Sequence, residues 1–223
     1  MQTLTERDYA KILICLAIYL ASLFASNTLG LKIMPFLFGS HLSVSVFYFP
    51  IIFLMTDVIG EVYGKNWSKL FVRAGFLSTA LFIGYSLLSL AMPWAEKGMW
   101  AHDAYNTLFS VSGRIALASL VAFLVAEYQD VLTFFFVKRK IGEGFFWLRS
   151  FLSNLWSQLL DTALFMTIAF AGTGLYDTKT LMNIIITWWM FKVLMGLLYT
   201  PLSYLGIHIL RNYGNAKEAK SQS

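Results

Sequence analysis

The sequence predicts an all-α, polytopic membrane protein with about six transmembrane helices, and two observations support this fold class. Only 13% of the 223 residues are charged and 58% are hydrophobic, whereas about a quarter of the residues in a soluble domain are charged. Apolar segments also recur along almost the whole chain, and each is close to the roughly 20 residues that a helix needs to span a bilayer. No soluble domain fits between them, so we expect a single transmembrane domain over residues 1–223.

The first three expected spans are residues 12–31, 44–63 and 70–92. The first span follows Arg7 and Lys11 and could be mistaken for a signal peptide. It is longer than a typical signal-peptide apolar region, however, and no clear cleavage site follows it. We therefore expect a retained helix. Turns are marked by Met34-Pro35 before the second span and by Pro93 after the third.

The last three expected spans are residues 113–136, 146–170 and 181–209. The fourth span is the weakest of the six because three polar residues interrupt its apolar run: Glu127, Gln129 and Asp130. The glycines between Gly172 and Gly174 mark the turn between the fifth and sixth spans. Pro201 lies inside the sixth span and predicts a kink, because proline removes a backbone donor and clashes with the preceding turn.

The distribution of basic residues predicts the orientation. Twelve of the 17 Lys and Arg residues fall on the side that carries both termini, four fall on the opposite side, and Lys192 lies within a span. Cytoplasmic loops of membrane proteins are enriched in Lys and Arg, so both termini are expected in the cytoplasm. The net charge of +5 then needs no nucleic-acid partner, because such binding requires basic residues clustered on one face.

Three ionisable residues within the spans indicate a functional interior. Asp57, Asp161 and Lys192 would each cost about 2.5–3.5 kcal/mol at a helix centre if they faced lipid. They are therefore expected to face a bundle interior or a wet cavity. Asn154, Gln158 and Asp161 share one helix face, since they are four and three residues apart. The functional interpretation is a substrate or ion site, and the alternative is a structural ion pair that locks helices together.

Lys192 lies near the middle of the sixth span, one turn after Trp188. An isolated ammonium group at that depth should find a partner, so we expect Lys192 to pair with Asp57 or Asp161. Asn27 adds a neutral polar group in the first span, where hydrogen bonding between helices explains it equally well.

Three further charged residues are candidates for gating or coupling: Glu61, Arg114 and Asp130. Glu61 follows Asp57 by one turn, although solvation or pairing with Lys65 would also account for it. Arg114 and Asp130 are expected near opposite membrane surfaces. Between them, alanines at four-residue spacing predict a close helix contact: Ala118, Ala122 and Ala126.

The sequence favours neither an enzyme nor a metal protein. It contains no HExxH, GxSxG or P-loop motif, so we expect no catalytic residue and no cofactor. Cys15 is the single cysteine, which excludes an internal disulfide and a multi-cysteine metal site. An intramembrane aspartyl pair formed by Asp57 and Asp161 remains as an alternative, although neither residue has a Gly-x-Gly-Asp context.

The second expected span carries a recognisable motif. Residues 49–64 read FPIIFLMTDVIGEVYG, which resembles the FPxxFLxTDxxxExYG signature of the queuosine precursor transporters, a stand-alone family of vitamin-uptake-like bacterial membrane proteins. Ser157-Gln158 with Asp161-Thr162 extends the resemblance into the fifth span. Arg114, Asp130 and Lys192 agree as well.

The resemblance implies import of 7-deazaguanine precursors such as preQ0 and preQ1 through the bacterial cytoplasmic (inner) membrane. The expected partners are a small purine-like substrate and the lipid bilayer, and a homodimer is left open as the assembly. The residues that could contact the substrate are Asp57, Asn154, Gln158, Asp161, Trp188, Lys192 and Asn27. The competing interpretation is a substrate-binding membrane subunit that depends on a separate energising module.

Overall fold

The computed structural model describes residues 4–30, 32–35, 41–109, 113–142, 144–174 and 176–221. Within these ranges it contains seven α-helices, a short 3-10 helix and a two-stranded hairpin. The helices are α1 (Glu6–Leu29), α2 (Ser45–Tyr63), α3 (Lys65–Ala91), α4 (His102–Phe109), α5 (Gly113–Ile141), α6 (Phe146–Phe170) and α7 (Thr178–Ser221). The remaining elements are β1 (Ile33–Pro35), β2 (His41–Ser43) and η2 (Glu96–Ala101).

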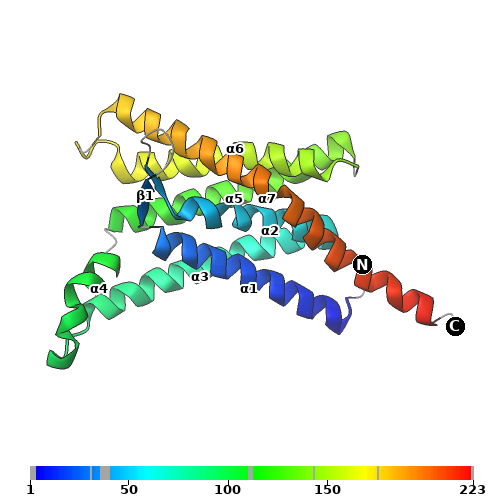
Figure 1. The fold of residues 1–223 in the computed structure, drawn as a ribbon, viewed down its shortest axis with the longest axis horizontal. Coiled ribbons are helices and arrows are strands. Elements are labelled where there is room, and N and C mark those ends of the chain that lie inside the picture. Colours follow the sequence, from blue (N-terminus) through cyan, green and yellow to red (C-terminus); the bar gives the residue numbers. More distant parts are fainter. Residues whose placement is uncertain are drawn as a thin grey trace.

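The six long helices form a bundle, with both termini at the same end (Figure 1). The central helix is α2, which contacts the other five long helices. It turns directly into α3 at Gly64, whose φ of 92° lies in the left-handed region that favours glycine. The short helix α4 stands at the opposite end of the bundle, where Tyr105 and Ser89 of α3 share a hydrogen bond (Figure 1).

Each of the six predicted spans corresponds to one long helix, so the predicted all-α polytopic fold is confirmed. Five helices are long and apolar enough to cross a membrane: α1, α2, α3, α5 over Ile115–Ile141 and α7 over Thr178–Arg211. The exception is α6, which has 25 residues but an interior face of polar side chains that lowers its hydropathy. Its packing along α5 and α7 favours a sixth span, which stays a prediction.

The helix bounds differ from the predicted spans mainly at the ends. The helices α1, α3 and α7 begin before the predicted starts, and α7 continues beyond residue 209. These extensions are polar, so an apolar pattern cannot find them. The hairpin of β1 and β2 and the helices η2 and α4 were not predicted either, because they lie in the connections between spans.

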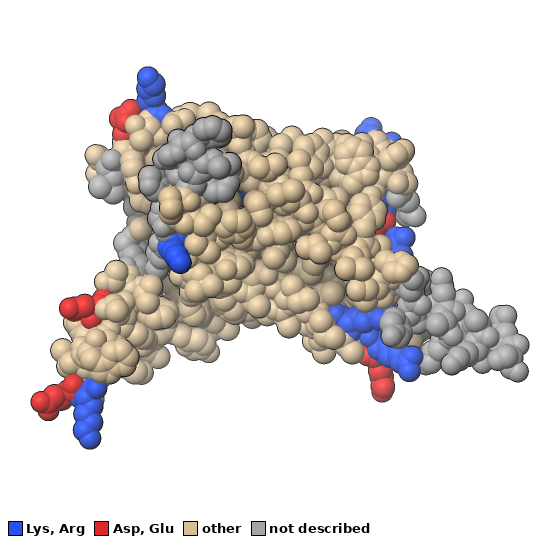
Figure 2. Space-filling model, viewed as in Figure 1, with Lys and Arg blue, Asp and Glu red and all other residues tan. Residues whose placement is uncertain are grey.

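The outer surface has the composition of a membrane protein. Charged side chains gather towards the two ends of the face shown in Figure 2, and the surface between them is almost entirely uncharged. Large apolar side chains on several helices are exposed, among them Leu13, Leu77, Leu117 and Leu198. Exposed apolar surface on this scale is typical of a face in contact with lipid or another protein.

Inside the bundle, α1, α2, α3 and α5 share a core that includes Tyr19, Ile52, Phe71 and Phe123. The alanines predicted to form a close contact on α5 are all buried: Ala118, Ala122 and Ala126.

Candidate functional site

The polar interior is built mainly by α6. Eight of its buried residues are polar and recur at intervals of three and four positions, so they form one continuous face of the helix. They are Arg149, Ser150, Ser153, Asn154, Ser157, Gln158, Asp161 and Thr162. Since α6 packs against α5, α7 and α2, this face points into the bundle.

Asp57 on α2 anchors a hydrogen-bonded chain along this face. The Ser150 hydroxyl donates to Asp57 Oδ2, and Asn154 Nδ2 donates to the same oxygen at 3.2 Å. Gln158 Nε2 then donates to Asn154 Oδ1 at 3.3 Å. The structure thus joins three of the predicted substrate residues. The side-chain oxygen Oε1 of Gln158 is buried and has no donor among the described residues.

Lys192 on α7 forms the predicted intramembrane ion pair, and its partner is Asp161. Lys192 Nζ lies 2.8 Å from Asp161 Oδ2 and 3.1 Å from Thr162 Oγ1. It also lies 4.2 Å from the centroid of the Phe49 ring on α2, a cation–π contact. The pair links α6 to α7 in the interior, where both side chains are 9% exposed.

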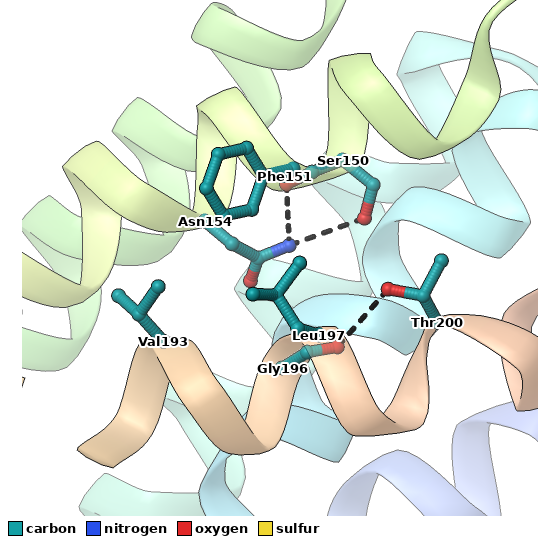
Figure 3. Close-up of a pocket in the computed structure, with 7 residues that line it drawn as sticks. All are labelled: Ser150, Phe151, Asn154, Val193, Gly196, Leu197 and Thr200. Atoms are coloured by element: carbon teal, nitrogen blue, oxygen red, sulfur yellow. Dashed lines mark hydrogen bonds between the residues drawn. The ribbon is translucent and has the colours of Figure 1, made fainter. Parts of the chain in front are cut away.

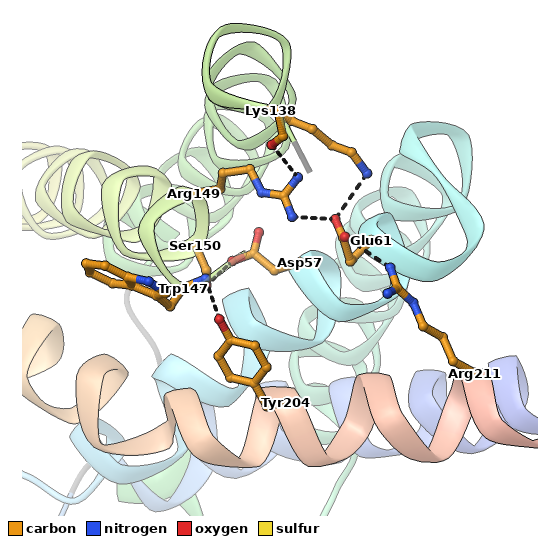
Figure 4. A network of polar contacts seen from close by, with 9 residues as sticks. Asp57, Glu61, Lys138, Trp147, Arg149, Ser150, Tyr204 and Arg211 are labelled. Atoms are coloured by element: carbon orange, nitrogen blue, oxygen red, sulfur yellow. Dashed lines mark hydrogen bonds and ion pairs between the residues drawn. The ribbon is translucent and has the colours of Figure 1, made fainter. Parts of the chain in front are cut away.

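Glu61 sits in a cluster of ion pairs at the end of the bundle that carries both termini (Figures 1 and 4). It pairs with Arg149 at 3.0 Å, with Lys138 at 3.1 Å and with Arg211 at 3.1 Å. These four residues come from α2, α6, α5 and α7, so one carboxylate fastens four helices together.

One expectation about this cluster was wrong. Glu61 is neither solvated nor paired with Lys65, because it is buried beneath its three partners while Lys65 lies over the Phe135 ring. Arg149, one of the twelve basic residues on the side of the termini, is fully buried. Its guanidinium contacts the rings of Phe134 and Phe146, which provide an apolar setting for its charge.

Asp130 on α5 also departs from expectation. It was expected near a membrane surface, but it is fully buried and accepts a hydrogen bond of 2.8 Å from the Ser157 hydroxyl near the middle of α6. One turn earlier on the same helix, Glu127 is equally buried.

The other predicted site residues are not part of the network that the structure describes. Asn27 is exposed and accepts only a long hydrogen bond of 3.5 Å from Ser119. Trp188 is half-buried one turn before Lys192. The side chain of Arg114 lies outside the described residues.

A small cavity lies between α6 and α7, beside the hydrogen-bonded chain (Figure 3). Ser150, Asn154, Gly196 and Thr200 contribute to its lining. Its volume is about 10 Å³, which accommodates about one water molecule. A planar ring does not fit into this cavity.

Sequence reasoning missed four residues of this interior: Phe49, Glu127, Arg149 and Ser150. The helical spacing of Arg149 and Ser150 with Ser153 and Asn154 would have identified both as part of the α6 face. Glu127 was noticed only as an interruption of an apolar run. Phe49 had no chemical signal of its own, because aromatic residues are common throughout this chain.

Apolar outer surfaces around an interior of carboxylate, amide and ammonium groups are the features of a polytopic membrane protein with a buried polar site. A family model described as putative vitamin uptake transporter matches residues 43–206, and the chain belongs to this family. It is 29% identical to the probable queuosine precursor transporter of Bacillus subtilis (strain 168) over 177 residues, which cover 79% of this chain and 76% of that protein.

It is also 26% identical to the queuosine precursor transporter of Escherichia coli (strain K12) over 200 residues, which cover 89% of this chain and 87% of that protein. No solved structure matches this chain. The predicted family is therefore confirmed.

Proposed function

We propose that this protein imports 7-deazaguanine precursors of queuosine, of the preQ0 and preQ1 class, across the bacterial cytoplasmic membrane. The names of its two relatives support the substrate class. The observation that carries the proposal is the buried chain of Asp57, Asn154 and Gln158, which ends in an oxygen without a donor.

The chemistry of these groups suits a guanine-like ring. Its Watson–Crick edge presents adjacent N–H donors and a carbonyl acceptor. The Asp57 carboxylate and Gln158 Oε1 can accept from the donors, while an amide NH₂ group or the Lys192 ammonium can donate to the carbonyl. Phe49 and Trp188 are aromatic residues near the pair, and stacking of a base on such a ring contributes about 1–3 kcal/mol.

The ion pairs suggest how the site could respond to a substrate. Lys192 is held by Asp161, so a substrate that binds either group competes with the pair and loosens α7 from α6. The Glu61 cluster closes the end of the bundle that carries both termini, the end predicted to face the cytoplasm. Release into the cytoplasm then requires at least part of this cluster to separate.

Uptake by purified protein in liposomes tests the proposal. We expect labelled preQ1 or preQ0 to enter, and unlabelled precursor to compete. Gln158→Ala should abolish uptake while melting temperature and protein yield stay near wild type, whereas Asp161→Asn should abolish uptake and also lower the melting temperature, because Lys192 loses its partner. Ser86→Ala is a matched control, because Ser86 bonds only a carbonyl of its own helix among the described contacts. Failure of wild-type protein to transport either precursor would contradict the proposal.

The same assay separates the competing interpretation. A substrate-binding subunit that depends on an energising module would bind preQ1 in detergent but would not transport it in liposomes. A wild-type protein with that behaviour would require a search for the module.

A further inference from the structure

The interior contains three carboxyl groups for which the described structure provides no cation. They are Asp57 on α2 and Glu127 and Asp130 on α5, all between 0% and 2% exposed. The neighbouring acids are neutralised, since Asp161 pairs with Lys192 and Glu61 pairs with three cations. Three uncompensated charges in an interior of low dielectric constant are strongly unfavourable. Something must therefore neutralise them.

Asp57 on α2 and Asp130 on α5 bind neighbouring turns of the same α6 face, since Asn154 donates to Asp57 and Ser157 donates to Asp130, and α2 packs against α5. Two carboxylates cannot bond to each other, because neither has a donor until one carries a proton. Accordingly Asp130 Oδ2 has no donor among the other described groups, whereas Oδ1 accepts from Ser157. A single proton between the two residues would halve their combined negative charge and supply a donor for the orphaned oxygen.

A second, independent observation comes from α1. Tyr19 is fully buried, and its hydroxyl has no partner in hydrogen-bonding geometry among the described residues. It packs in one cluster with Phe123, one turn before Glu127 on α5, and both carboxyl oxygens of Glu127 are also without a donor among the described residues. Orphaned polar atoms of this kind are rare in protein interiors, and here they converge on the same acidic group.

The surroundings favour a proton over a metal ion. The ionisable groups around the three acids are Tyr19 from α1 and Asp161 from α6, with Lys192 of α7 already bound to Asp161. On α3, Lys69 lies over the Tyr128 ring. Within the described residues no group of three acidic, histidine or cysteine side chains is arranged to hold a metal ion.

We propose that Asp57 and Asp130 share a transported proton, with Glu127 held as a neutral acid beside them, and that this protein is a proton-coupled transporter. The coupling rests on the proposed function, because Asp57 belongs both to this pair and to the substrate chain. Substrate N–H groups that bind Asp57 need it ionised, so the shared proton moves to Asp130. Substrate and proton are then bound together and cross together.

The test uses full-length protein in liposomes with the membrane potential clamped. We expect an inward proton gradient to drive accumulation of preQ1 by the wild type. Asp130→Asn mimics the protonated acid, so it should still exchange internal for external preQ1 but lose all accumulation beyond equal concentrations. Glu127→Gln should retain proton-driven accumulation without loss of stability, because the amide replaces an acid that is already neutral. Glu96→Gln is the control, since Glu96 is an exposed carboxylate in η2.

Infrared spectroscopy of the same samples without substrate gives an independent readout. The wild type should show carbonyl bands of protonated carboxylic acids at neutral pH. Asp130→Asn should remove or shift the band of the Asp57–Asp130 pair, whereas the band that Glu127→Gln removes belongs to Glu127. This measurement tests whether the acids carry a proton, and its result holds even if preQ1 is not the substrate. Absence of the band, accumulation driven by sodium alone, or full proton-driven accumulation by Asp130→Asn would each overturn the proposal.

Discussion

Lys192 and Asp161 illustrate how a single buried pair can both stabilise the empty protein and respond to a ligand. Taking two charges out of water is unfavourable, and their attraction in the interior offsets this only when the geometry is good. Here the ammonium also contacts Thr162 and the Phe49 ring, so it is well satisfied. Loss of either partner leaves an uncompensated charge, which is the physical basis of the first prediction at this scale.

Lys192→Met should destabilise the ligand-free protein by about 3–5 kcal/mol, because Asp161 is then buried without its cation. Adding Asp161→Asn should recover part of that loss without recovering transport, since both groups of the proposed substrate site are then changed. Thermal melting in detergent measures the first effect and liposome uptake the second. A double variant no more stable than Lys192→Met would show that the pair contributes little.

At the scale of elements, α6 shows which features the sequence predicts, namely the bounds of the helix and its polar stripe, and which it does not, namely the partners of that stripe. Its bounds agree with the predicted span, and the stripe of Asn154, Gln158 and Asp161 lies on the interior face. The partners of that stripe were not predictable, because contacts between helices far apart in sequence depend on rotation and depth. The sequence therefore left Asp57 and Asp161 open as partners of Lys192, and in the structure the partner is Asp161.

The second prediction concerns the cluster of ion pairs at Glu61, which joins four helices. Glu61→Gln removes the carboxylate that pairs with three cations, so this end of the bundle should open more often. A cysteine placed by Ser153→Cys in a Cys15→Ser background should then react faster with a water-soluble maleimide added on the side of the termini.

Glu6→Gln is the matched control for this experiment, because Glu6 is an exposed carboxylate at the same end. Equal labelling rates with and without Glu61→Gln, in protein of unchanged yield, would mean that the cluster does not close the path.

At the scale of the whole molecule, charge and hydropathy divide the protein into two charged ends and an uncharged middle (Figure 2). The connection between α5 and α6 lies at the end that carries both termini, and the connection between α6 and α7 lies at the other end (Figure 1). The first connection follows Lys138, Arg139 and Lys140, whereas Lys179 is the basic residue near the second.

This asymmetry yields the last prediction, which concerns topology. Basic residues remain on the cytoplasmic side. A reporter protein inserted after Lys140 should therefore report a cytoplasmic location, and the same reporter inserted after Gly174 should report a location outside the cytoplasm. A phosphatase and a fluorescent protein, which report opposite sides, provide reciprocal signals at both positions. Signals from the same side at both positions would mean that α6 does not cross the membrane, and its polar face would then line an interior formed by the other five helices alone.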